Sequence, residues 1–396
     1  MKRFLVLAMA AVCVVGASWG LLAQTPGVTD TTIKLGSFIV QSGGVAFIGV
    51  PVMRGAQAWY SYVNDELGGI HGRKIEFLAF DDAFNPANTV AVMKRLVEQE
   101  NIFALVNPLG TIGMAASWTY ILENKLPVVS PHMNWLTLAS PTVPHVFAIQ
   151  PNNESFGRAA AQYAVLELGA KRVAIAVVED AMGTELLDFA LDELKVQGVQ
   201  PVIVVKYPGT ETSFSAYALA LRQARAEAVL LFSYVGDAAK LIVECDLLGF
   251  KPKFVGINTI TLQLYDLAGE AAEGVVFPGF GTDPQDPTSE AAAAMRAVYA
   301  RYYPGELMNA YAMIAYVGAQ MVTKALMDAG PNLTRQAFID ALDAFTGWDA
   351  DGMIPAVTYR PDDHYGIKTL WMNQLKTING VRTAEFITEW DWTQNR

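Results

Sequence analysis

The sequence predicts an α/β protein built from two doubly wound, Rossmann-like lobes. Three observations predict this class. Short apolar, β-branched runs alternate with amphipathic helical patterns almost without a break along the 396 residues. The strand runs are almost continuously hydrophobic, which is typical of parallel strands covered by helices on both faces. The alternation also falls into two series, which start near residues 33 and 146, and each series is long enough to build one lobe.

The first series begins with the run IKLGSFIV and contains four expected strands and three expected helices. Asn85 and Pro86 give one helix a clear start, because asparagine is a favoured N-cap and proline fits the first helical position. The expected strands cover 33–40, 74–80, 103–110 and 127–131, and the expected helices cover 50–67, 85–100 and 113–124.

The second series repeats the pattern and ends in a different tail. Its expected strands cover 146–151, 172–180, 202–209, 228–234 and 253–259, and its expected helices cover 154–169, 184–198, 213–224 and 237–249. The tail then predicts three helices at 288–306, 309–330 and 335–345, followed by strand-like runs at 356–361, 368–380 and 385–392. Between the lobes there is no low-complexity linker, so the boundaries near 150 and 280 predict short crossovers that could serve as a hinge.

The N-terminus has the layout of a secretory signal peptide over residues 1–23. Met1-Lys2-Arg3 precedes an apolar run that ends near Gly16, and cleavage is expected after Ala23. A retained membrane anchor, or a lipid on Cys13, is the alternative. We therefore expect a periplasmic or otherwise extracytoplasmic protein. Cleavage leaves Cys245 alone in an apolar helical pattern, which predicts a buried thiol and no intramolecular disulfide.

Composition and motifs exclude several functions. A net charge of −11 and a pI near 4.9 argue against nucleic-acid binding, which needs clustered lysine and arginine. Nucleophile-elbow, phosphate-loop and dinucleotide motifs do not occur, and the four histidines lack metal-ligand spacing. We expect neither catalysis nor a cofactor or metal. The adjacent pair Asp81-Asp82 could be an acid/base or metal pair, but a turn and capping role is the favoured interpretation.

Small polar residues with aromatic neighbours follow the expected strands. Ligands of open α/β sheets bind beyond the carboxyl ends of the strands, and helix N-termini there favour a carboxylate or another acceptor. The pattern therefore predicts a binding pocket without a nucleophile. The strand ends in question are 41–44, 107–111, 130–135, 151–153, 179–180, 233–234 and 258–259.

These stretches resemble the type I periplasmic binding proteins that bind branched-chain amino acids (leucine, isoleucine and valine) for ABC importers. The resemblance covers about residues 30–390, and the run GGIHGRKIEFLAFDDAFNP at 68–86 is its most specific part. Other matching stretches are IKLGSF, GGVAFIGVPVMRGA, LPVVSPHMNW, FKPKFVG and AAEGVVF.

The resemblance implies two lobes joined by a three-strand hinge, with the ligand enclosed when the lobes close. It places the first lobe at 28–151 plus 280–355 and the second at 152–279 plus 356–396. For Trp135 and Phe156, stacking on the ligand and a place in the core both remain open. The strand ends and the resemblance together give the expected ligand-binding residues. They are Ser42, Phe47, Ile48, Leu109, Gly110, Thr111, His132, Met133, Asn134, Trp135 and Tyr311 in the first lobe, and Asn153, Phe156, Met182, Tyr234 and Asn258 in the second.

One departure from the family pattern bears on the ligand. Amino acid binders hold the ligand's ammonium group with acidic residues in the second lobe, where this sequence has Asn153 and Asn258. A buried ammonium without a counter-charge costs several kcal/mol. We therefore expect a small aromatic or aliphatic carboxylate, or an amide. An amino acid is the alternative, with Asp180 or Glu154 as the substitute acid.

The resemblance implies a permease and an ATPase at the membrane as partners, and we expect a monomer that binds a small molecule. Two other functions remain open. One is a metal-dependent exported hydrolase that uses Asp81, Asp82 or Asp180, and the other is a ligand sensor for a membrane receptor.

Overall fold

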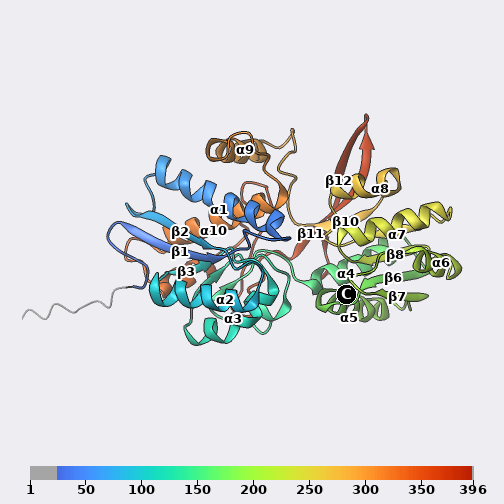
Figure 1. Cartoon of the computed structure of the whole chain (residues 1–396), viewed down its shortest axis with the longest axis horizontal. Helices are drawn as coiled ribbons and strands as arrows, with labels where there is room; N and C mark the ends of the chain where they lie inside the picture. The colour runs from blue at the N-terminus through green and yellow to red at the C-terminus, as the bar shows by residue number, and fades with distance from the viewer. Residues whose placement is uncertain (1–24, 395–396) are drawn as a thin grey trace, which may run out of the picture.

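The computed structural model describes residues 25–394, which form two lobes that lie side by side (Figure 1). Each lobe contains one β-sheet with helices on both of its faces, so the predicted fold class is confirmed. Each lobe also buries two hydrophobic clusters, one on either face of its sheet. The predicted signal peptide at 1–23 lies outside the described residues.

The first lobe contains a five-stranded parallel sheet in the order β2-β1-β3-β4-β5. Its strands are buried and rich in valine, leucine and isoleucine, as a parallel sheet covered on both faces requires. The strands are β1 (Thr32–Phe38), β2 (Lys74–Phe80), β3 (Ala104–Val106), β4 (Val128–Val129) and β5 (Val146–Phe147).

Helices of the first lobe come from both the N-terminal half and the tail. The N-cap of α2 is confirmed, since Asn85 Oδ1 accepts the N–H of Ala87 at 2.9 Å and Pro86 is the first helical residue. The helices are α1 (Ala46–Glu66), α2 (Pro86–Lys94) with a π-helical turn (Arg95–Gln99), α3 (Thr111–Glu123), a 3₁₀ turn (Leu136–Leu138), α9 (Glu290–Tyr302), α10 (Ala310–Asp328) and α11 (Arg335–Asp343).

The second lobe contains a seven-stranded sheet in the order β12-β11-β10-β9-β8-β6-β7. Five strands are parallel, and the last two form an antiparallel hairpin that extends the sheet beyond β10. The hairpin projects from the lobe in Figure 1. The strands are β6 (Val173–Val178), β7 (Ile203–Tyr207), β8 (Ala228–Phe232), β9 (Lys253–Val255), β10 (Val276–Gly279), β11 (Thr369–Ile378) and β12 (Val381–Asp391).

Helices of the second lobe follow its parallel strands. Cys245 on α7 is fully buried in the core, as predicted, and burial raises the pKa of its thiol to about 12. The helices are α4 (Asn153–Gln162) with a π-helical turn (Tyr163–Glu167), α5 (Ala181–Val196), α6 (Ser215–Gln223), α7 (Val235–Leu247), α8 (Gln263–Ala268) and a 3₁₀ turn (Gly269–Ala272).

The chain passes between the lobes three times: after β5, after β10 and before β11. The third crossing bears on the lobe limits. Val357, Tyr359 and Ile367 are buried in the core of the first lobe, and the N–H of Ala148 donates to the carbonyl of His364 at 2.9 Å. The strand-like run at 356–361 forms only isolated bridges. We therefore propose that the C-terminal part of the second lobe begins near residue 368 rather than at 356.

Among residues 25–394, no helix combines the length and the apolar character that a membrane crossing requires.

Candidate functional site

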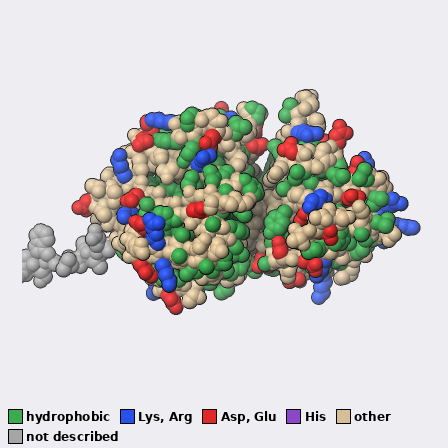
Figure 2. Space-filling view, viewed as in Figure 1, with side chains coloured by type: hydrophobic (Ala, Val, Ile, Leu, Met, Phe, Trp, Pro, Cys, Tyr) green, Lys and Arg blue, Asp and Glu red, His purple; other side chains and the backbone are tan. Residues whose placement is uncertain are grey.

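A groove separates the two lobes, and apolar side chains line both of its sides (Figure 2). The loops that follow β1, β3 and β4 in the first lobe, and β6, β8 and β9 in the second, carry most of the predicted site residues. These loops stand at the carboxyl ends of parallel strands, where open α/β sheets bind ligands.

An exposed aromatic and aliphatic surface forms part of the first-lobe side. Phe47, in the first turn of α1, is 64% exposed, and Tyr311, in the first turn of α10, is 39% exposed. Ile48 is half-buried against the core, and Ser42 is exposed in the loop before α1. Large side chains exposed in this way offer an apolar ligand a place to pack.

The N-terminus of α3 supplies hydrogen-bond donors. Thr111 is exposed and is the first residue of this helix, whose opening N–H groups have no acceptor within the helix. Gly110 precedes it with φ of 110°, a conformation that favours glycine, and a Cβ there would lie 2.8 Å from the ring of Phe84. Leu109 is buried and forms a bridge with His132, which places the β3 loop next to the β4 loop.

The β4 loop contributes one half-buried amide and several buried side chains. His132 is 7% exposed, its Nδ1 lies 3.2 Å from Gln150 Nε2, and burial lowers the pKa of its imidazole to about 3. The ring is therefore neutral and supplies no positive charge. Met133 is buried in the core, and half-buried Trp135 packs edge-on against Trp118 with ring centroids 5.5 Å apart.

Three asparagines from the two lobes lie together where the lobes meet. Asn134 Nδ2 donates to Asn258 Oδ1 across the lobes at 3.4 Å, and the backbone N–H of Asn153 donates to the carbonyl of Asn134 at 3.3 Å. The Oδ1 atoms of Asn134 and Asn153 are buried, and neither accepts a hydrogen bond from any residue between 25 and 394. Buried acceptors of this kind favour a ligand that donates to them.

An acid that the sequence reasoning missed adjoins this asparagine cluster. Glu185 Oε2 accepts a hydrogen bond of 2.7 Å from Asn153 Nδ2. Glu154, which was expected as a substitute acid, pairs instead with Arg158 at 2.8 Å. Glu185 lies three residues after Met182 on α5, so helical spacing from a predicted site residue was the signal that could have found it.

The second-lobe side presents Tyr234, which is 49% exposed. Its hydroxyl donates to Asp180 Oδ2 at 3.0 Å, and Asp180 also caps α5 through the N–H of Gly183. Burial and the nearby Asp180 carboxylate raise the pKa of Tyr234 to about 12, so the hydroxyl keeps its proton. Met182 is half-buried between the two cores of this lobe.

Phe156 does not face the groove. Its side chain is fully buried in the core of the second lobe, with the ring of Phe280 6.2 Å away. Of its two predicted roles, the structure supports the place in the core and not stacking on a ligand. Residue type alone could not decide this, because Phe156 begins an apolar helix face.

The pair Asp81-Asp82 has the turn and capping role that the sequence favoured. Asp81 Oδ1 accepts the N–H groups of Gln41 at 2.8 Å and Ala83 at 2.9 Å. Asp82, which is 1% exposed, accepts the N–H of Phe84 at 3.0 Å and the hydroxyl of Thr89 at 2.7 Å. Partial burial acts to raise the pKa of Asp81, but hydrogen bonds from Gln41, Ser42 and Ala83 outweigh it and lower that pKa. Both carboxylates therefore stabilise the loop between β2 and α2.

Between residues 25 and 394, no three His, Cys, Asp or Glu side chains gather closely enough to hold a metal ion.

Comparison with known proteins agrees with this architecture. A profile of the periplasmic binding protein family matches residues 32–380, which is most of the chain. The chain belongs to this family. The predicted resemblance to the branched-chain amino acid branch of the family is therefore confirmed. Its members are extracytoplasmic substrate-binding proteins, not enzymes.

Relatives and solved structures illustrate the range of the family. The chain is 26% identical to the Leu/Ile/Val-binding protein BraC3 of Rhizobium johnstonii over 83% of this chain and 87% of that protein. Leucine binding protein LivK of Thermotoga maritima superposes with a TM-score of 0.75 at 20% identity, covering 91% of this chain and 99% of that one. A fatty acid ABC transporter substrate-binding protein of Thermomonospora curvata superposes with a TM-score of 0.77 at 22% identity, covering 94% and 96%.

Proposed function

We propose that the protein is the extracytoplasmic solute-binding subunit of an ABC importer and captures a small ligand between its lobes by hinge closure. The main supporting observation is that Asn134 of the first lobe is hydrogen-bonded to Asn153 and Asn258 of the second. A ligand bonded to these three amides would touch both lobes at once, and so would stabilise the closed form. The closed form would then dock on a permease and its ATPase.

The body of the ligand is apolar or aromatic in this proposal. Phe47, Tyr311 and Tyr234 are each more than a third exposed on the groove walls, and half-buried Trp135 adds a fourth ring. Covering such surface contributes roughly 25 cal/mol per Å² of apolar area removed from water. An apolar body of this kind supplies binding energy, and the polar groups orient the ligand.

The head group is an amide or a carboxylate. The N-terminus of α3 and the Thr111 hydroxyl offer donors to an oxygen of either group. The free Oδ1 atoms of Asn134 and Asn153 are acceptors, which an amide N–H₂ satisfies and a carboxylate does not. Of the two head groups, the asparagine cluster therefore favours an amide over a carboxylate.

An amino acid is the second candidate, and Glu185 is the observation that favours it. Its carboxylate is bonded to Asn153, so a ligand ammonium bound at Asn153 Oδ1 would have a negative charge close by. The names of the relatives point the same way, since they bind leucine, isoleucine and valine.

Calorimetry with matched ligands distinguishes the two candidates. We would titrate leucine, 4-methylpentanamide and 4-methylpentanoate, which share one side chain, into wild type and Glu185→Gln. If the ligand is an amide, 4-methylpentanamide binds more tightly than both leucine and 4-methylpentanoate. Glu185→Gln then changes the affinity for 4-methylpentanamide by less than about fivefold.

If the ligand is an amino acid, leucine binds more tightly and Glu185→Gln weakens it by about a hundredfold or more, because a buried ammonium loses its counter-charge. Failure of all these ligands, and of aromatic counterparts such as phenylacetamide, to produce heat or raise the melting temperature would contradict the proposed ligand class.

A further inference from the structure

A second pocket lies on the first lobe, away from the groove between the lobes. It has a volume of about 320 Å³ and lies between the second half of α1, the turn after it, α10 and the loop at 348–351. Along α1, Val63 is sixteen residues from Phe47, which is about 24 Å at 1.5 Å per residue. The pocket is therefore separate from the site proposed above.

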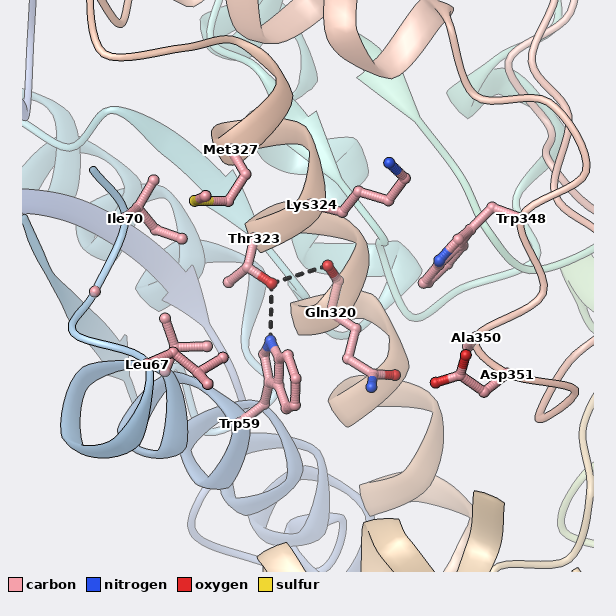
Figure 3. A pocket seen from close by; sticks show the side chains of 12 residues that line it. Trp59, Leu67, Ile70, Gln320, Thr323, Lys324, Met327, Trp348, Ala350 and Asp351 are labelled. Carbon is pink, nitrogen blue, oxygen red and sulfur yellow. Dashed lines mark hydrogen bonds between the residues drawn. The ribbon is translucent and has the colours of Figure 1, made fainter. Parts of the chain in front are cut away.

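The pocket has an apolar and aromatic lining. Trp59, Leu67 and Met327 form one part of it, and Trp348 stands on the opposite side in Figure 3. The indole N–H of Trp59 is already bonded to Thr323 Oγ1 at 2.8 Å, and the Thr323 hydroxyl donates to the carbonyl of Gln320 at 2.9 Å. These bonds hold Trp59 in place and leave its ring available for packing.

Two acceptors in this pocket lack partners. Gln320 Oε1 is buried, and no residue in the described part of the chain donates to it. Asp351 is exposed and forms no ion pair within residues 25–394. In Figure 3 the Gln320 amide and the Asp351 carboxylate lie on the same side of the pocket. Two acceptors on the same side of one pocket favour a shared donor, and a positively charged donor above all.

The one lysine in the lining does not neutralise this site. Lys324 Nζ is bonded to Asp328 at 2.8 Å and lies 5.5 Å from the ring of Phe345. Figure 3 shows its ammonium group directed away from Gln320 and Asp351. The negative charge of Asp351 is therefore available to a bound cation.

The loop that carries Asp351 is held in a strained form. Ala350 and Asp351 have φ of 52° and 58°, left-handed values that are unfavourable for most non-glycine residues and above all here for Ala350. Ala350 is 4% exposed, so its packing in the core keeps the loop in this form. The packing of Ala350 therefore fixes the position of Asp351 beside the pocket.

We propose that this pocket binds a small organic cation: an ammonium group on an aromatic or apolar body. The ammonium donates to Gln320 Oε1 and pairs with Asp351, and the body packs between Trp59 and Trp348, where an indole face also attracts the cation. An organic anion is disfavoured because Asp351 would repel it.

Calorimetry on the full chain with 2-phenylethylamine as the probe tests this site. We expect a Kd of about 1 mM or below for 2-phenylethylamine, and at least tenfold weaker binding of its neutral isostere 2-phenylethanol. Gln320→Leu and Asp351→Asn should each weaken the amine by about fivefold or more. Gln320→Glu should tighten it, because the acceptor gains a charge.

The control is the groove variant Asn153→Ala, which should leave the affinity for 2-phenylethylamine unchanged. Circular dichroism of every variant checks the fold, and Gln320→Glu keeps the test decisive if Gln320→Leu does not fold. Three results would each overturn the proposal. The first is that wild type does not bind the amine, and the second is that Gln320→Leu and Asp351→Asn bind it as tightly as wild type. The third is that Asn153→Ala loses binding. Loss of binding in Asn153→Ala would place the amine in the groove, whereas the other two results leave solute capture there unaffected. The leucine-side-chain ligands test that capture separately.

Discussion

His132 is a buried base beside the groove, and its burial ties the stability of the protein to pH. Burial holds its pKa at about 3 in the folded protein, whereas an unfolded histidine titrates near 6.5. Between these two values the unfolded chain binds a proton that the folded chain does not. Above about pH 6.5 the His132 titration therefore does not lower the free energy of unfolding. Below that pH the free energy of unfolding falls by about 1.4 kcal/mol per pH unit.

We expect His132→Gln to remove this part of the pH dependence. Between pH 7 and pH 5 the free energy of unfolding of wild type should fall by about 2 kcal/mol more than that of the variant. Urea unfolding of both proteins at pH 7 and pH 5 measures these free energies. Any stability that the variant loses through poorer packing is already present at pH 7, so it does not enter the difference between the two pH values. Equal falls in the two proteins would mean that His132 takes up its proton without unfolding.

Single residues show how far sequence reasoning about the site reaches. Tyr234 and Phe47 were predicted from strand ends and family pattern; both side chains are exposed, and their contact with a ligand stays a prediction. Phe156 was named for the same reasons and is fully buried. Glu185 was not named, because its importance comes from a bond to Asn153, thirty-two residues earlier in the chain. Proximity created by folding is not present in any local pattern.

Helices α1 and α10 pack so closely that one position requires glycine. A Cβ on Gly55 would lie 2.0 Å from the carbonyl oxygen of Ala312, a backbone atom that cannot move alone. Gly236, in α7, is also helical but has no atom within 4 Å of such a Cβ. Both glycines are helical, but packing constrains Gly55 and not Gly236, so Gly236 can serve as a control for a substitution at Gly55.

We expect Gly55→Ala to destabilise the protein by about 1–3 kcal/mol, because overpacking outweighs the gain of up to about 1 kcal/mol in helix propensity. Gly236→Ala, the control, should be neutral or stabilise by up to about 1 kcal/mol. Denaturant unfolding compares both with wild type. If Gly55→Ala proves as stable as Gly236→Ala, the close approach of α1 and α10 is wrong.

At the scale of elements, the hydrophobic period predicted the parallel strands and most helices but not strand direction in the tail. Strands β11 and β12 were expected as strand-like runs, and they form an antiparallel hairpin. Its turn, Asn379-Gly380, has φ of 51° and 81°, the signature of a tight hairpin turn. The run at 356–361 did not become a strand in either sheet, because its apolar residues fill the first-lobe core instead.

The two lobes and their three crossings place hinge motion at the scale of the whole molecule. The first and third crossings lie next to each other in the fold, since Ala148 and Ile149 bond to the chain at 364–367. Both lobes have exposed rings, Phe47 on the first and Tyr234 on the second, which we propose to lie on the walls of the groove. Covering them with a ligand and with each other would favour closure, and Asn134 and Asn258 already connect the two lobes by a hydrogen bond.

We therefore expect saturating ligand to make the molecule more compact and more stable. Small-angle scattering should give a smaller radius of gyration with the tightest ligand of the leucine-side-chain set than without it. At a hundred times its Kd, that ligand should add about 2.7 kcal/mol to the free energy of unfolding. The variant Asn134→Ala should need a higher ligand concentration to reach the same compaction, because it lacks the Asn134 amide that we propose to bond to the ligand in the closed form. An unchanged scattering curve at calorimetric saturation would contradict closure and place the ligand on one lobe alone.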